Sequence, residues 1–166
     1  LSQQIGKWIL IINLPVFILM IIFPDAIINI FFGQEYLSGA NPLRLFAIGA
    51  FFLALAEIPY KLLTMKGKSK VLLLDVTSIA LLNIFLNFLL VPRYGMTGAA
   101  TATMVSFMSL AVLFTLQTRY YLFITPFRRK MLNVFLSAII STVPLLYLRT
   151  LIPITMVSFL VVALFF

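Results

Sequence analysis

Long apolar runs separated by short polar or basic segments set the pattern of the chain. They predict membrane-spanning helices, because about 20 consecutive apolar residues cross the hydrocarbon core of a bilayer. Six are expected: one ending near residue 23, then 43–65, 71–91, 95–117, 131–148 and one from 152. Pro24 and Asp25 are typical of a second helix start, which predicts a short continuation over 26–32 that stops at Gly33. Residues 34–42 are expected to form a loop.

The stretch 81–103 predicts two antiparallel neighbouring helices. Its turn is marked twice, by Pro92, which lacks an N–H, and by Gly95, which tolerates unusual backbone torsions. Asn83 and Asn87 stand four residues apart and therefore project from one face of the first helix. Because a lipid-facing amide is costly, this face should meet other helices or a watered cavity. Hydrogen bonding between helices and lining of a cavity are both open.

Small residues recur after the turn, at Gly98, Ala102 and Ser106. This four-residue spacing puts them on one stripe of a helix. Such a stripe lets two helix backbones approach closely in lipid, where burial against other apolar groups gives no hydrophobic advantage. We expect it to be a packing surface.

Composition supports a membrane protein and an all-α fold. The chain is 63% hydrophobic and 10% charged, whereas soluble domains contain roughly a quarter charged residues. The net charge of +8 does not indicate nucleic-acid binding, because the basic residues lie in short patches beside apolar spans. Alternating loops place eight cations on one side, Lys7, Lys66, Lys68, Lys70, Arg119, Arg128, Arg129 and Lys130, and three on the other, Arg44, Arg93 and Arg149. The first side is predicted to be cytoplasmic, in a multi-pass protein of the cytoplasmic membrane.

Three ionisable residues inside predicted spans are candidate coupling or cavity residues. Glu57 and Lys61 share a helix face, so they could bind a coupling ion within a cavity, or form an intrahelical ion pair with the Lys stem reaching the surface. Pro59 between them could also expose carbonyls that coordinate a cation. Asp75 could pair with Lys61 or Lys70 or relay protons.

Catalytic and metal chemistry find no support in the sequence. The chain has neither Cys nor His, so thiolate chemistry, disulfides and the usual zinc ligands are excluded. No nucleophile stands with a base, and no Gly-rich loop could cradle a phosphate. We expect no enzyme activity, no metal and no cofactor.

Three segments together resemble the polysaccharide or O-antigen flippase family of the multidrug, oligosaccharidyl-lipid and polysaccharide exporter superfamily. They are a Phe-Gly-x-Glu-Tyr loop at residues 32–36, the Asn83 and Asn87 pair, and Pro-x-Tyr-Gly-x-x-Gly-Ala-Ala at residues 92–100, with the basic turn KGKSK between the first two. Their order and spacing extend over residues 32–106.

The resemblance implies a transporter of twelve to fourteen helices in two bundles, which flips a lipid-pyrophosphate-linked oligosaccharide by alternating access. Residues 1–125 would be the later helices of the second bundle and 126–166 two additional C-terminal helices. The cationic cavity residues that would hold a pyrophosphate are largely absent from these spans. Since the sequence does not begin with Met and ends inside an apolar run, we expect it to be part of a longer protein.

The expected partners are membrane lipid, a lipid-linked oligosaccharide, preceding helices of the same chain, and a coupling cation, either H⁺ or Na⁺. Two other functions remain open. One is a cation-coupled multidrug exporter of the same superfamily. The other is a non-transporting membrane scaffold for glycan synthesis.

Overall fold

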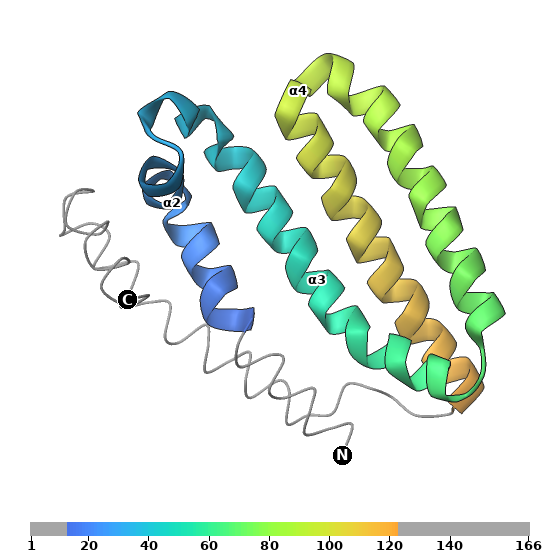
Figure 1. Cartoon of the computed structure of the whole chain (residues 1–166). Coiled ribbons are helices and arrows are strands. Elements are labelled where there is room, and N and C mark those ends of the chain that lie inside the picture. Colours follow the sequence, from blue (N-terminus) through green and yellow to red (C-terminus); the bar gives the residue numbers. More distant parts are fainter. Residues whose placement is uncertain (1–12, 123–166) are drawn as a thin grey trace.

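The computed structural model describes residues 13–122, which are almost wholly helical (Figure 1). A helix over Asn13–Ile22 leads to α2 (Pro24–Phe31), the 3₁₀ helix η1 (Gln34–Gly39), α3 (Ala40–Met65) and α4 (Ser69–Leu122). The described residues therefore confirm the predicted all-α class, and the count of six spanning helices stays a prediction. The two predicted spans at 131–148 and from 152 onward, and the predicted domain boundary at 125, lie outside the described residues.

Helix α4 is a hairpin. Only Gly95 within it has non-helical torsions, at φ 55° and ψ −130°. Two antiparallel arms, residues 69–94 and 96–122, meet there (Figure 1). Atoms of Asn83 and Ser106 lie 3.1 Å apart, whereas a straight helix would separate these residues by about 35 Å. The predicted hairpin is therefore confirmed, but Pro92 lies inside the first arm and not in the turn.

Small residues line the contact between the two arms of the hairpin. Gly98, Ala102 and Ser106 are buried on the second arm, as the stripe predicts. A Cβ atom on Gly98 would lie 2.4 Å from the carbonyl oxygen of Leu90 on the first arm. The two backbones therefore approach so closely that no larger residue fits at position 98. Buried residues continue at the same four-residue spacing at Leu110, Phe114 and Thr118, but this row turns around the helix towards α3.

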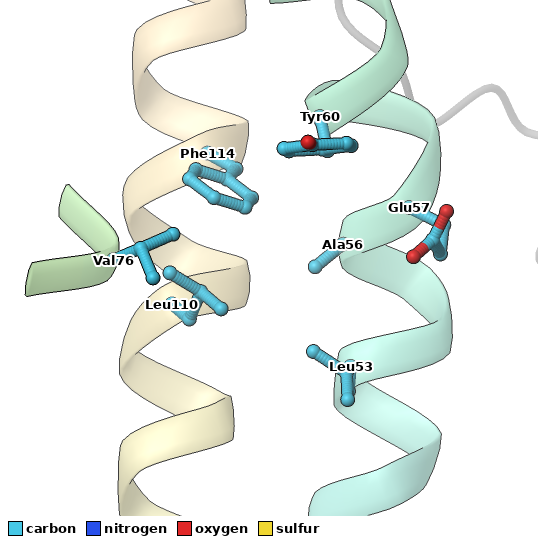
Figure 2. A pocket seen from close by; sticks show the side chains of 7 residues that line it. All are labelled: Leu53, Ala56, Glu57, Tyr60, Val76, Leu110 and Phe114. Atoms are coloured by element: carbon cyan, nitrogen blue, oxygen red, sulfur yellow. The ribbon is translucent and has the colours of Figure 1, made fainter. Parts of the chain in front are cut away.

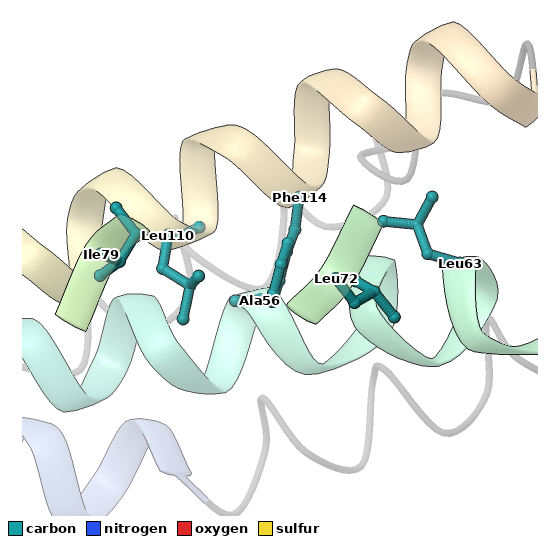
Figure 3. Close-up of a cluster of buried hydrophobic side chains, with 7 residues drawn as sticks. Ala56, Leu63, Leu72, Ile79, Leu110 and Phe114 are labelled. Atoms are coloured by element: carbon teal, nitrogen blue, oxygen red, sulfur yellow. The ribbon is translucent and has the colours of Figure 1, made fainter. Parts of the chain in front are cut away.

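Helix α3 packs on the second arm of α4, which lies between α3 and the first arm (Figure 1). A Cβ atom on Gly49 would lie 2.9 Å from the Met104 Cα, and Thr118 contacts Pro59 further along. Residue numbers rise together along this contact, so α3 and the second arm run parallel. All three segments contribute to one apolar cluster, of Ala56, Leu63, Leu72, Ile79, Leu110, Ala111 and Phe114 (Figure 3).

The first described helix and α2 form a bent pair, with an angle of 92° between Asn13–Ile22 and Pro24–Phe31. Pro24 occupies the first turn of α2, as predicted, and Gly33, at φ 93°, follows its end. The Asp25 carboxylate lies 3.6 Å from the Arg44 guanidinium and so joins α2 to α3.

Helix boundaries differ from the predictions where the sequence is polar. The predicted loop at 34–42 is wrong, because η1 occupies Gln34–Gly39 and α3 already begins at Ala40. The polar residues there fit a helix start because they lie at the exposed end of the bundle. The first arm likewise begins at Ser69, two residues early, and the second extends to Leu122, beyond residue 117.

Two stretches among the described residues, Gln34–Met65 and Ser69–Tyr121, are long and apolar enough to cross a membrane, and the bent pair is a third if it forms one span. The hairpin would cross twice, since each arm has about the length of a bilayer-spanning helix. Large apolar side chains are exposed along the first arm, among them Leu81, Ile84, Phe85 and Phe88. Such a surface suits lipid or further helices.

Gly98→Ala should destabilise the hairpin by about 1–3 kcal/mol, because the added methyl group meets backbone atoms that move only if the arms separate. The melting temperature of the purified protein in detergent measures this. Met96→Ala, on an exposed side chain of the same arm, is the control and should change it little. Equal melting temperatures for Gly98→Ala and the unchanged protein would contradict the close approach.

Candidate functional site

A chain of hydrogen bonds joins the two arms of α4. The Asn83 side-chain amide donates to Ser106 Oγ at 3.1 Å, and the Ser106 hydroxyl donates to the Ala102 carbonyl at 2.8 Å. The Asn87 amide donates to Asn83 Oδ1 and to the Asn83 carbonyl, both at 2.9 Å. The interhelical role is thus confirmed for Asn83, whereas Asn87 bonds within its own helix and orients Asn83.

A hollow of about 160 Å³ lies where three segments meet. Its lining residues come from α3 and from both arms of α4: Leu53, Ala56, Glu57, Tyr60, Val76, Leu110 and Phe114. Figure 2 shows Leu53, Ala56 and Tyr60 directed from α3 towards the second arm, while Glu57 lies on the side of α3 away from that arm. The rings of Tyr60 and Phe114 are 5.8 Å apart between centroids. The hollow is therefore mainly apolar, and Glu57 is its one acidic lining residue.

Glu57 and Lys61 form an ion pair. Lys61 Nζ lies 3.6 Å from Glu57 Oε2, and their side chains are 57% and 48% exposed, respectively. This geometry confirms an intrahelical pair and leaves an ion-coupling role untested. Exposed pairs of this spacing contribute only about 0.3–0.5 kcal/mol in water.

Pro59 meets a buried side chain that sequence reasoning missed. Thr118 is fully buried, and its hydroxyl donates to the Pro59 carbonyl at 3.5 Å. The contact ties α3 to the second arm beside the Glu57 and Lys61 pair. The Gly98 stripe does not indicate it, because 20 residues of helix place Thr118 about 160° around the helix from Gly98.

Asp75 pairs with neither of its expected partners. Lys61 contacts Glu57 instead, and Lys70 stands five residues away, which rotates the two side chains about 140° apart around the helix. Asp75 Oδ2 is buried with no hydrogen-bond partner, and so is Gln117 Oε1 on the second arm. A buried carboxylate oxygen without a donor is costly unless it holds a proton or a cation.

Charged groups separate to the two ends of the bundle. Lys66, Lys68 and Lys70 lie at the turn between α3 and α4, beside the end of the second arm that carries Arg119. Asp25, Arg44 and Arg93 lie at the other end, near η1 and the Gly95 turn (Figure 1). For the described residues this is the predicted grouping, whereas Lys7, Arg128, Arg129, Lys130 and Arg149 lie outside them. That the basic end is cytoplasmic remains a prediction.

The described part of the chain shows no metal-binding site. Residues 13–122 contain no group of three His, Cys, Asp or Glu side chains that could hold a metal ion.

Known proteins share parts of this sequence. Over 150 residues, covering 90% of the chain, it is 30% identical to an uncharacterized membrane protein of Methanocaldococcus jannaschii. Over 103 residues, covering 60% of the chain, it is 33% identical to a Shigella flexneri protein named "Putative O-antigen transporter". The matches cover 30% and 25% of these relatives' lengths. No family model and no solved structure matches the chain. These similarities support a membrane protein, and the chain spans only about a quarter to a third of the length of these relatives.

Substitution of Asn83 and Ser106 tests the bond between the arms. In a cycle of Asn83→Ala, Ser106→Ala and the double variant, we expect a coupling free energy of roughly 0.6–2 kcal/mol, the range for polar contacts between membrane helices. Unfolding of the purified protein in bicelles provides the measurement.

The control cycle pairs Asn83→Ala with Ser109→Ala. The Ser109 hydroxyl donates to the Val105 carbonyl of its own helix, so this cycle should show no coupling. A coupling energy near zero in both cycles would show that the hydrogen bond contributes nothing between the arms.

Proposed function

We propose that the chain is part of a transporter that moves a lipid-pyrophosphate-linked oligosaccharide, of the O-antigen or polysaccharide repeat-unit type, across the cytoplasmic membrane. The observation that carries this proposal is the 33% identity over 103 residues to the Shigella flexneri protein named as an O-antigen transporter. The flippase-like motifs at residues 32–36, 83–87 and 92–100 support the same substrate class. The proposal assigns no catalytic step to the chain.

The geometry of the bundle supports transport in two ways. The three packed segments are apolar enough for the membrane, and they border an open hollow that Glu57 helps to line. The polar contacts sit at helix–helix seams, where Asn83 meets Ser106 and Thr118 meets Pro59. Alternating access requires helices that keep their shape while they move against others, and these seams would make the three segments one moving unit.

Asp75 favours a cation-coupled form of this activity. An intramembrane carboxylate usually faces a bundle interior and takes part in ion movement. Glu57 already has Lys61 as a counter-ion, whereas Asp75 Oδ2 has no partner. We therefore assign coupling by H⁺ or Na⁺ to Asp75 in preference to Glu57. The same observation would fit a cation-coupled drug exporter of the same superfamily.

Deletion of the gene tests the substrate class. In a strain that lacks redundant transporters, the lipid-linked sugar should accumulate on the cytoplasmic leaflet, because its synthesis continues while its exit is blocked. Leaflet distribution can be measured with a membrane-impermeant glycan-modifying reagent. An unchanged distribution, with unchanged surface glycan, would overturn the proposal and favour drug export or a scaffold role.

Two matched acid-to-amide substitutions test the coupling assignment in the full-length protein. Asp75→Asn should lower glycan export about tenfold or more, equal to about 1.4 kcal/mol in the limiting barrier. Glu57→Gln should leave export within about twofold, since it removes only a half-exposed ion pair. Export is measured per membrane-resident protein, with abundance quantified in parallel. Loss of export in Glu57→Gln at normal abundance, with Asp75→Asn active, would reverse the assignment.

A further inference from the structure

A basic surface lies at one end of the bundle, where α3 turns into α4. It consists of Lys66, Lys68, Lys70 and Arg119, and we call it the basic end surface. The turn that carries its lysines is fixed by backbone hydrogen bonds: the Lys66, Gly67 and Lys68 N–H groups all donate to carbonyls of the last turn of α3. Gly67 adopts φ 69°, which allows this tight closure. The lysines therefore project from a rigid backbone.

Lys68 joins this turn to the second arm. Its Nζ lies 4.6 Å from the centroid of the Tyr121 ring, which is a cation–π geometry. Tyr121 in turn packs against the apolar cluster of the bundle. Arg119, two residues earlier, is exposed on the same terminal turn. Two basic segments that are about 50 residues apart in the sequence therefore lie at the same end of the bundle. The ammonium N–H groups of Lys68 remain able to donate hydrogen bonds.

Acidic side chains of the described residues do not neutralise this surface. The ion pairs of residues 13–122 are Asp25 with Arg44 and Glu57 with Lys61, and neither includes a cation of the basic end surface. Four like charges in one region repel one another. An anionic partner would relieve this repulsion.

Exposed apolar and aromatic side chains adjoin the cations. Met65 is 84% exposed and Tyr120 is 74% exposed. Tyrosine is enriched at the boundary between hydrocarbon and headgroups, where one end of the ring is apolar and the other is wet. This combination at the ends of membrane-spanning helices fits the phosphate level of a bilayer better than it fits a nucleic acid or a soluble acidic protein.

We propose that the basic end surface binds the headgroup phosphates of anionic phospholipids, which hold the α3–α4 turn against the end of the second arm. Headgroup phosphates at the lysines would offset the repulsion between these charges and so keep the turn beside the Lys68–Tyr121 contact. Arg119 projects about 160° away from Tyr121 around the helix, so it would meet a separate headgroup. Bound lipid would therefore stabilise the packing of α3 on the hairpin. This binding does not depend on which substrate the protein transports.

Native mass spectrometry of the full-length protein tests the proposal. Nanodiscs contain phosphatidylglycerol and phosphatidylcholine with identical acyl chains, and the lipids that remain bound are counted. Phosphatidylglycerol should be retained preferentially. Each Lys→Gln substitution at Lys66 or Lys70 should weaken its binding about fivefold, because one basic residue near an anionic surface contributes about 1 kcal/mol of attraction. Arg93→Gln, at the other end of the hairpin, is the matched control and should not change this retention.

Charge and residue identity are separated by a second pair of variants. Lys66→Arg with Lys70→Arg should retain phosphatidylglycerol, whereas Lys66→Gln with Lys70→Gln should lose it and should no longer gain thermal stability from it. Both side chains are exposed, so these changes should leave the fold intact.

Three results would overturn the proposal. They are equal retention of phosphatidylcholine, unchanged retention in the glutamine variant, and displacement of phosphatidylglycerol by millimolar pyrophosphate. The last would assign the surface to the pyrophosphate of a transported lipid-linked substrate. Lipid retention is measured without transport. A negative result in the glycan-export assay would therefore overturn the proposed function but not the lipid-binding proposal.

Discussion

Close backbone contact between helices is the constraint on which the rest of the structure depends. In a bilayer, lipid tails are as apolar as Leu, so burying Leu against Leu does not hold two helices together. Packing and hydrogen bonds must do so. Gly98 against the Leu90 carbonyl and Gly49 against Met104 bring backbones within reach of each other, and the short side chains between them leave little empty space. The hairpin and its contact with α3 therefore both depend on positions where a glycine allows two backbones to come close.

The polar contacts follow from this proximity. Because Gly98 and Ala102 draw the arms together, Ser106 comes within 3.1 Å of the Asn83 amide. Because Gly49 fixes where α3 crosses the second arm, Pro59 and Thr118 meet further along. An amide or hydroxyl buried without a partner is costly, so each contact also opposes sliding of one helix along the other. Apolar packing alone would resist such sliding much less.

Local pattern predicted the helices, the Gly95 hairpin and its small-residue stripe, because spacing within one helix determines which side chains share a face. Contacts between distant segments were not predictable in this way. Arg44 was predicted to lie at the end opposite the basic turn, but no local pattern pairs it with Asp25, whose carboxylate it meets from another helix. The pairing expected for Asp75 was wrong because proximity in sequence to Lys70 does not place both side chains on one face. The polar composition of residues 34–42 led to a wrong prediction of a loop, because these residues form helix at an exposed end of the bundle.

The positions of the acids explain why they differ in their fitness for ion coupling. Glu57 has Lys61 four residues later on its own helix, so the pair forms whenever α3 forms and does not depend on neighbouring helices. Asp75 Oδ2 is buried without a hydrogen-bond partner, so its solvation depends on the arrangement of the groups around it. A group whose solvation depends on helix arrangement can link ion binding to that arrangement, since a ligand shifts an equilibrium only through different affinities for its two states. For this reason we propose Asp75 as the coupling group in preference to Glu57, which has a partner on its own helix.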